Sequence, residues 1–152
     1  MKKLLLAVLL VGVGACGRSA TTPPGEVTPV SATGAGAETP QAAVDRFLST
    51  VRAGDLQAMS LIWGSEKGPA RDNIPRAELE KREIILQCYL KHDSYKILDE
   101  ANAAGGRRVF DVELKKKDLT RTTNMHTVRG PKGRWFVEKT DIAALRDFCT
   151  EM

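Results

Sequence analysis

Residues 44–59 read VDRFLSTVRAGDLQAM, and this stretch decides the fold. Four of its apolar residues follow the spacing i, i+3, i+4 and i+7, which places them on one side of an α-helix. They are Val44, Phe47, Leu48 and Val51. Gly54 suits the left-handed residue that ends a helix, and Asp55 suits the N-terminal cap of the next one. The stretch therefore predicts two consecutive helices on one core, the first of them capped by Thr39.

A third helix is expected further along the chain, over residues 76–91. Asn73 is expected to cap it, with Pro75 near its first turn, where a missing N–H has little effect. The polar residues 65–74 contain a Gly-Pro pair and predict a loop before this helix. The buried face of the helix is predicted from its apolar positions, Leu79, Ile85, Leu86, Tyr89 and Leu90.

In the second half of the chain, apolar residues recur at every second position, which indicates strands. Between residues 110 and 115, apolar side chains alternate with charged ones, as in a strand with one buried and one solvated face. The expected strands cover residues 95–98, 110–115, 120–129 and 134–139. A short last helix is expected over residues 142–149. Helices followed by strands predict an α+β fold, with N-terminal helices packed on a curved antiparallel sheet and a short C-terminal helix.

The N-terminus has the organisation of an export signal. Lys2 and Lys3 precede an apolar run that is too short to span a bilayer. The sequence VGAC at residues 13–16 resembles a bacterial lipobox, which implies cleavage before Cys16 and attachment of lipid to its thiol. We therefore expect a signal peptide over residues 1–15. A lipidated Cys16 with a disordered linker, rich in Pro, Gly, Ser and Thr, would extend to residue 38, and one α+β domain would cover residues 39–152.

This N-terminus also predicts a location. Gly17 follows the cysteine and no aspartate does, which resembles the sorting signal of outer-membrane lipoproteins. We expect a lipid-anchored protein of the bacterial cell envelope, on the periplasmic face of the outer membrane where two membranes exist. Without Lys2 and Lys3, 21 of the 23 basic residues remain against 19 acidic ones, so the net charge falls from +4 to +2. This charge and this location give no reason to expect nucleic acid as a partner.

The chain has three cysteines, of which Cys16 lies in the N-terminal signal and the other two lie in the expected domain. Lipidation of Cys16 would leave Cys88 and Cys149 as a pair in an oxidising compartment, where paired thiols usually become disulfides. We therefore predict a Cys88–Cys149 disulfide that clamps the C-terminal helix to the third helix. A redox-active pair would be expected to show a CxxC spacing, which these two cysteines lack.

The helix order and two stretches, residues 44–59 and GRWFVEKTDI at residues 133–142, resemble the nuclear-transport-factor-2-like superfamily. The resemblance covers about residues 39–141. It implies a cone of helices wrapped by a curved sheet, a pocket at the mouth of the cone and, in many members, a homodimer formed through the sheet. The superfamily contains enzymes, binding domains and interaction modules, so the fold does not assign a function. The possible pocket residues are Trp63, Tyr89, Met125 and Trp135.

His126 is the main catalytic candidate. It is expected in the middle of a strand, and Asp111 and Glu113 alternate on the neighbouring strand, so a His126–carboxylate pair across the sheet is geometrically feasible. A solvated pair of polar residues is the simpler interpretation. Two histidines without Cys–His spacing predict no metal site, and no Gly-rich phosphate loop precedes a helix, so no cofactor is expected.

Three functional hypotheses remain. The first is a non-catalytic, membrane-tethered domain that binds an envelope protein or a small apolar ligand. The second is an enzyme of isomerase or dehydratase type that uses His126 with Asp111 or Glu113. The third is a structural accessory subunit of an envelope complex. The first is favoured because the sequence carries no catalytic signature.

Overall fold

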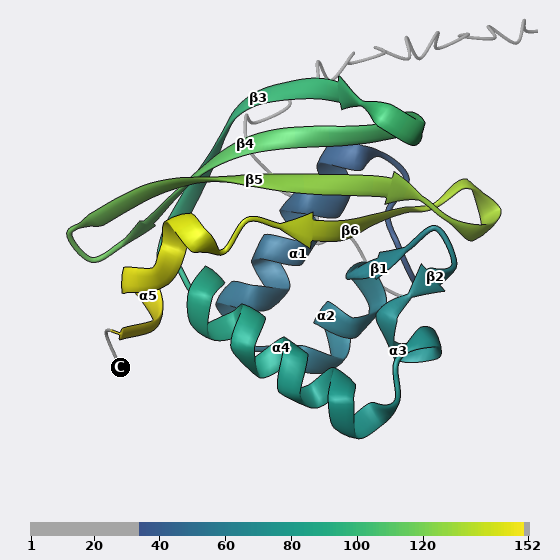
Figure 1. The fold of residues 1–152 in the computed structure, drawn as a ribbon, viewed down its shortest axis with the longest axis horizontal. Coiled ribbons are helices and arrows are strands. Elements are labelled where there is room, and N and C mark those ends of the chain that lie inside the picture. The colour runs from purple at the N-terminus through teal and green to yellow at the C-terminus, as the bar shows by residue number, and fades with distance from the viewer. Residues whose placement is uncertain (1–33, 151–152) are drawn as a thin grey trace, which may run out of the picture. The chain divides into compact units, whose positions relative to one another are not determined.

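The computed structural model describes residues 34–150 of the 152-residue chain. The expected signal peptide, the expected lipidation site Cys16 and most of the expected linker lie outside the described residues. Within the described part, N-terminal helices pack against a four-stranded antiparallel sheet, and a short helix lies at the C-terminal end (Figure 1). The predicted α+β class is therefore confirmed.

The helices and strands follow one another in two blocks. The helices are α1 (Pro40–Ala53), α2 (Leu56–Ile62), α3 (Ala70–Asn73), α4 (Arg76–Leu90) and α5 (Arg146–Thr150). The main sheet has the order β3 (Ser94–Ala103), β4 (Arg107–Lys116), β5 (Leu119–Arg129) and β6 (Trp135–Thr140). A small ribbon is formed by β1 (Gly64–Ser65) and β2 (Gly68–Pro69). Because the strand order of the main sheet follows the chain, tight turns connect its neighbouring strands.

The first helix matches the sequence closely. The Thr39 hydroxyl accepts a hydrogen bond from the Ala42 N–H at 3.1 Å, and Gly54 ends the helix with a φ of 72°. Asp55 then caps α2 by accepting from the Ala58 N–H at 2.9 Å. The four residues of the predicted apolar stripe are each at most 1% exposed: Val44, Phe47, Leu48 and Val51. Both caps and the buried face of α1 are therefore confirmed.

Apolar side chains fill the space between the helices and the sheet. Figure 1 shows α1, α2 and α4 on one side of the sheet, and the buried side chains of β4 and β5 point toward that side. The largest side chains with no solvent exposure include Phe47, Met59, Leu90, Phe110, Leu114, Met125 and Phe148. The alternation in residues 110–115 is confirmed, because Phe110, Val112 and Leu114 are all fully buried.

The fourth helix departs from its prediction. Asn73 does not cap it, because the Asn73 amide donates to the Pro69 carbonyl at 2.8 Å, and no side chain caps the helix. Ile85 is 51% exposed, whereas Glu83 is only 1% exposed. The reason is that α4 packs through a narrow stripe with the spacing i, i+4, i+7 and i+11, which Ile85 does not occupy. The stripe consists of Leu79, Glu83, Leu86 and Leu90.

The expected loop over residues 65–74 contains regular structure. It folds as β2 and α3, and β1 ends within it. A Cβ atom at Gly64 would lie 2.3 Å from the Gly68 carbonyl oxygen, so only glycine allows β1 and β2 to approach so closely. Similarly, β3 runs from Ser94 to Ala103, well beyond the expected residues 95–98, because it pairs with β4 along most of its length.

The folded part begins before the expected boundary at Thr39. Ala37 is 6% exposed, and its backbone exchanges two hydrogen bonds of 2.8 Å with Trp135 on β6. Arg46 and Arg134 both donate to the Gly36 carbonyl at 2.9 Å. These long-range contacts hold residues that the composition alone had assigned to the linker.

Candidate functional site

The predicted catalytic residues lie on the face of the sheet that points away from the helices. His126 is opposite Val109 in the β4–β5 register, and Asp111 is opposite Asn124. Their chain neighbours Phe110 and Met125 are fully buried on the helix side. Because side chains alternate along a strand, His126, Asp111 and Glu113 share the outer face.

The outer face does not hold His126 against either predicted carboxylate. The Asp111 carboxylate accepts a hydrogen bond from the Asn124 amide. The Glu113 carboxylate lies 3.8 Å from the Lys115 ammonium. Among residues 34–150, no hydrogen bond joins His126 to Asp111 or Glu113. The structure therefore does not assemble this pair as an acid–base dyad.

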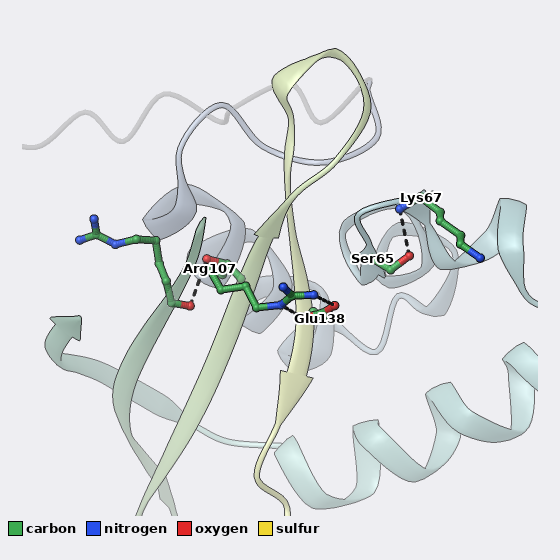
Figure 2. Close-up of polar contacts among 6 residues, drawn as sticks. Ser65, Lys67, Arg107 and Glu138 are labelled. Carbon is green, nitrogen blue, oxygen red and sulfur yellow. Dashed lines mark hydrogen bonds and ion pairs between the residues drawn. The ribbon is translucent and has the colours of Figure 1, made fainter. Parts of the chain in front are cut away.

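An ion pair instead spans the outer face close to His126. Arg107 on β4 donates to the Glu138 carboxylate on β6 at 2.6 and 2.9 Å, and the pair crosses β5 because β5 lies between these strands. Figure 2 shows the Arg107 and Glu138 side chains in contact. The same view includes a hydrogen bond in the small β1–β2 ribbon, where the Lys67 N–H donates to the Ser65 hydroxyl at 3.1 Å. The pKa of Glu138 is lowered, chiefly by the hydrogen bonds from Arg107 and to a smaller degree by the nearby His126.

A cleft of about 610 Å³ opens where β6 ends and the chain turns toward α5. We call it the β6 cleft. Its walls come from α4, from β5, from the end of β6 and from the turn into α5. The side chains that give it its chemistry are Tyr89, His126, Lys139, Asp141, Ile142 and Arg146.

Strand pairing and a tight turn position the polar side chains of the β6 cleft. Lys139 lies directly opposite His126 in the β5–β6 register, after an irregularity between His126 and Thr127 that shifts the pairing. The Asp141 N–H then donates to the Asn124 carbonyl at 3.0 Å. The Asp141 carboxylate accepts from the Ala143 N–H, also at 3.0 Å. This turn directs the chain into α5.

The predicted Cys88–Cys149 disulfide is confirmed, and it connects two walls of the β6 cleft. It joins α4 to α5 with the two Cα atoms 4.9 Å apart. Tyr89 follows Cys88 in α4, and Arg146 lies one turn before Cys149 in α5. Leu145 and Phe148 are fully buried, whereas Arg146 is exposed. The disulfide therefore holds the Tyr89 wall next to the Arg146 wall.

Only Tyr89 among the four possible pocket residues lines this cleft. Met125 is fully buried and Trp135 is 8% exposed, because both lie on the face of the sheet that meets the helices. The Arg129 guanidinium lies 5.2 Å from the centre of the Trp135 ring. Trp63 is partly buried and packs beside Val137 of β6.

No pattern in the sequence pointed to Lys139, Asp141 or Arg146 as site residues. The β5–β6 register places Lys139 opposite His126, whereas the turn after β6 and the disulfide help to place Asp141 and Arg146 in the lining of the same cleft. The positions of these three residues in the cleft do not follow from local sequence spacing. His126 and Tyr89 are the two lining residues of the cleft that the sequence predicted for a site.

A second cavity of about 560 Å³ lies beside the disulfide and has a more apolar wall. Its lining includes the apolar side chains of Ile84 and Phe148, the disulfide-bonded Cys88, and Lys91, Lys116 and Lys117. The Lys116 ammonium already donates to the Phe148 carbonyl and is buried. This cavity therefore offers fewer available polar groups than the β6 cleft.

Two titratable side chains are buried away from the lining of the β6 cleft. Burial raises the pKa of Glu83 from 4.5 to about 7, and nearby Glu80 adds to the shift. Burial lowers the pKa of His92, whose Nδ1 lies 2.8 Å from the Leu90 carbonyl. His92 also packs edge-on against Tyr95, with ring centres 5.6 Å apart. Because the pKa values of both groups are shifted by folding, the stability of the folded chain depends on pH.

Comparison of the chain with models of protein families and with curated proteins found no match. Among residues 34–150, no helix is long and apolar enough to cross a membrane, and no group of His, Cys, Asp or Glu side chains is arranged to hold a metal ion.

Proposed function

We propose that this chain is a lipid-anchored protein of the bacterial envelope whose folded domain is a non-catalytic binding module. The lipobox-like residues 13–16 support the anchor. The order of helices and antiparallel strands is compatible with the cone fold of the nuclear-transport-factor-2-like superfamily, and we propose that the domain is a member. The partner would be an envelope protein or a small ligand, and a homodimer through the sheet is part of the same proposal.

The observation that carries the non-catalytic assignment is the environment of His126. General acid–base catalysis requires an imidazole within hydrogen-bond reach of the group with which it exchanges a proton. The Asp111 carboxylate is instead engaged by Asn124, and the core beneath the sheet is filled by side chains such as Phe110 and Met125. A surface cleft of this kind is suited to binding a ligand or a partner.

The anchor and the partner can be tested in one experiment. The native chain and a Cys16→Ala variant are expressed in the host, and membranes are separated from soluble protein. We expect the native chain in the membrane fraction and the variant in the soluble fraction. Crosslinking followed by pull-down from those membranes should recover the same partner repeatedly. Equal membrane attachment of the variant, or recovery of no reproducible partner or ligand, would contradict the proposal.

One observation favours a second candidate function, an isomerase- or dehydratase-type enzyme. His126 lines a cleft of small-molecule size together with Tyr89. In this candidate function, Asp111 or Glu113 would have to move toward the imidazole. A His126→Ala variant that retains full function in its host would exclude this candidate, because the proposed pair with Asp111 or Glu113 cannot form without the imidazole.

A further inference from the structure

The two permanent cations of the β6 cleft have no acidic partner among residues 34–150. Lys139 and Arg146 form neither an ion pair nor a side-chain hydrogen bond with any of these residues. Most arginines in this part of the chain behave differently, because each has a carboxylate oxygen within 4 Å. These are Arg76, Arg82, Arg107, Arg108, Arg121 and Arg134. The cleft therefore gathers cations that the fold itself leaves uncompensated.

The geometry of the cleft concentrates this positive charge. Lys139 and His126 are direct cross-strand neighbours, so the residue opposite the Lys139 ammonium supplies no negative charge. Arg146 approaches from α5. The acid that lines the cleft, Asp141, already accepts the Ala143 N–H as the cap of its turn. A negative group bound in the cleft would compensate the positive charges of Lys139 and Arg146.

We propose that the β6 cleft binds an organic anion, a carboxylate or a phosphate ester with a small apolar body. The planar guanidinium of Arg146 matches the oxygens of either group, and Lys139 supplies a second charge-assisted donor. Tyr89 and Ile142 give the apolar body a surface to pack on. The volume of about 610 Å³ suits a small organic molecule better than a bare inorganic ion. This inference rests on the proposed binding function and names its ligand class.

The test uses the purified full-length chain in an uncharged detergent. Three probes of similar shape are titrated by calorimetry and by NMR of the imidazole protons: phenyl phosphate, benzoate and the neutral benzyl alcohol. The chain has two histidines, so a His126→Gln variant assigns the His126 signal. We expect at least one anion to bind saturably and to shift this signal, and benzyl alcohol to do neither. Equal shifts with benzyl alcohol, or no binding of either anion up to about 10 mM, would overturn the proposal.

Matched variants locate the binding site. Arg146→Gln and Lys139→Gln should each weaken anion binding about tenfold, because each removes one charge-assisted hydrogen bond. Arg71→Gln on α3 and Lys132→Gln in the β5–β6 turn change the net charge equally and should leave binding unchanged, since both residues lie outside the cleft. Equal weakening in all four variants would overturn the site, because it would indicate a general charge effect.

Two further arms distinguish the source of the anion and separate this proposal from the proposed function. The chain is placed in nanodiscs of phosphatidylcholine, with or without phosphatidylglycerol. A His126 shift that requires phosphatidylglycerol and no soluble anion assigns the phosphate to a lipid headgroup, whereas a shift with phenyl phosphate alone assigns it to a free ligand. The Cys16→Ala variant should bind the anions as the native chain does, so loss of the anchor would leave this result unaffected.

Discussion

Helices α1 and α4 have similar lengths and pack on the same core, yet only α1 follows its sequence pattern. In α1, every predicted core residue is buried. In α4, the acid Glu83 is 1% exposed, while Ile84 and Ile85 are 57% and 51% exposed. The difference shows that the apolar pattern determines burial where one stripe dominates. Where apolar residues lie on several sides of a helix, as in α4, packing against the neighbouring elements determines which side is buried.

The comparison also indicates where to look for departures from simple packing. Local rules in natural proteins are broken most often at strained or functional positions. In this chain α4 carries a buried acid, two exposed isoleucines, one half of the disulfide and the Tyr89 wall of the β6 cleft. Helix α1 contributes packing and a defined turn. Four predictions test this contrast, from the largest expected effect on stability to the smallest.

The largest effect is expected from removal of the disulfide that holds α4 to α5. The two cysteines are 61 residues apart in the chain. A Cys88→Ser, Cys149→Ser variant should lose roughly 4 kcal/mol of unfolding free energy, because the unfolded chain regains the entropy of an open loop. Urea denaturation under non-reducing conditions measures the loss. A Cys16→Ser variant is the control, and a similar loss in that variant would show that the effect is not specific to the disulfide.

A pair of alanine substitutions tests the contrast between the two helices directly. Leu48→Ala in α1 should cost about 3 kcal/mol, because a fully buried side chain leaves a cavity. Ile85→Ala in α4 should change stability by less than about 0.5 kcal/mol, because half of the side chain is already in water. Thermal unfolding of both variants gives the comparison. Equal losses would mean that Ile85 is buried in solution.

The buried acid of α4 predicts a pH dependence. The pKa of Glu83 is raised to about 7 in the folded chain, so the folded chain keeps a proton that the unfolded chain releases above its ordinary pKa of 4.5. Stability should therefore fall as the pH rises from about 4.5 to 7. The full shift corresponds to about 3 kcal/mol, and relaxation around the carboxylate should reduce the measured difference to about 2 kcal/mol.

A neutral variant isolates this contribution. Glu83→Gln should remove the fall in stability between about pH 5 and pH 8, because its side chain does not ionise. Glu66→Gln in the exposed β1–β2 turn is the matched control and should retain the fall. Urea unfolding midpoints of the three proteins at both pH values provide the measurement. Identical pH profiles for Glu83→Gln and the native chain would contradict the assignment.

The smallest effect is expected at the turn that ends α1. Gly54 has a φ of 72°, and a Cβ atom there would lie 2.9 Å from the amide nitrogen of Gln87 on α4. Gly54→Ala should lose about 1 kcal/mol, because an L-residue is strained in the left-handed region. Gly34→Ala is the control, since it has a negative φ and nothing within 4 Å of the added Cβ. Equal thermal midpoints for the two variants would remove the strain argument.

Much of the fold could be predicted, and much less of the candidate site. Helix caps and alternating strand patterns depend on neighbouring residues only. The sequence therefore predicted the caps Thr39 and Asp55, the helix end at Gly54 and the alternation around Val112. The cysteine count also predicted the disulfide. The expected dyad depended on which neighbours the outer face supplies, and Asn124 rather than His126 reached Asp111.

The sequence alone determined the α+β class, the buried face of α1 and the pairing of Cys88 with Cys149, because these depend on periodicity, capping and residue count. The tertiary structure alone decided that Glu83 is buried and that Lys139 and Arg146 line the same cleft as His126. The physical reason is separation along the chain. Residues far apart in sequence approach one another only after strand register, turns and the disulfide have set the distances between elements.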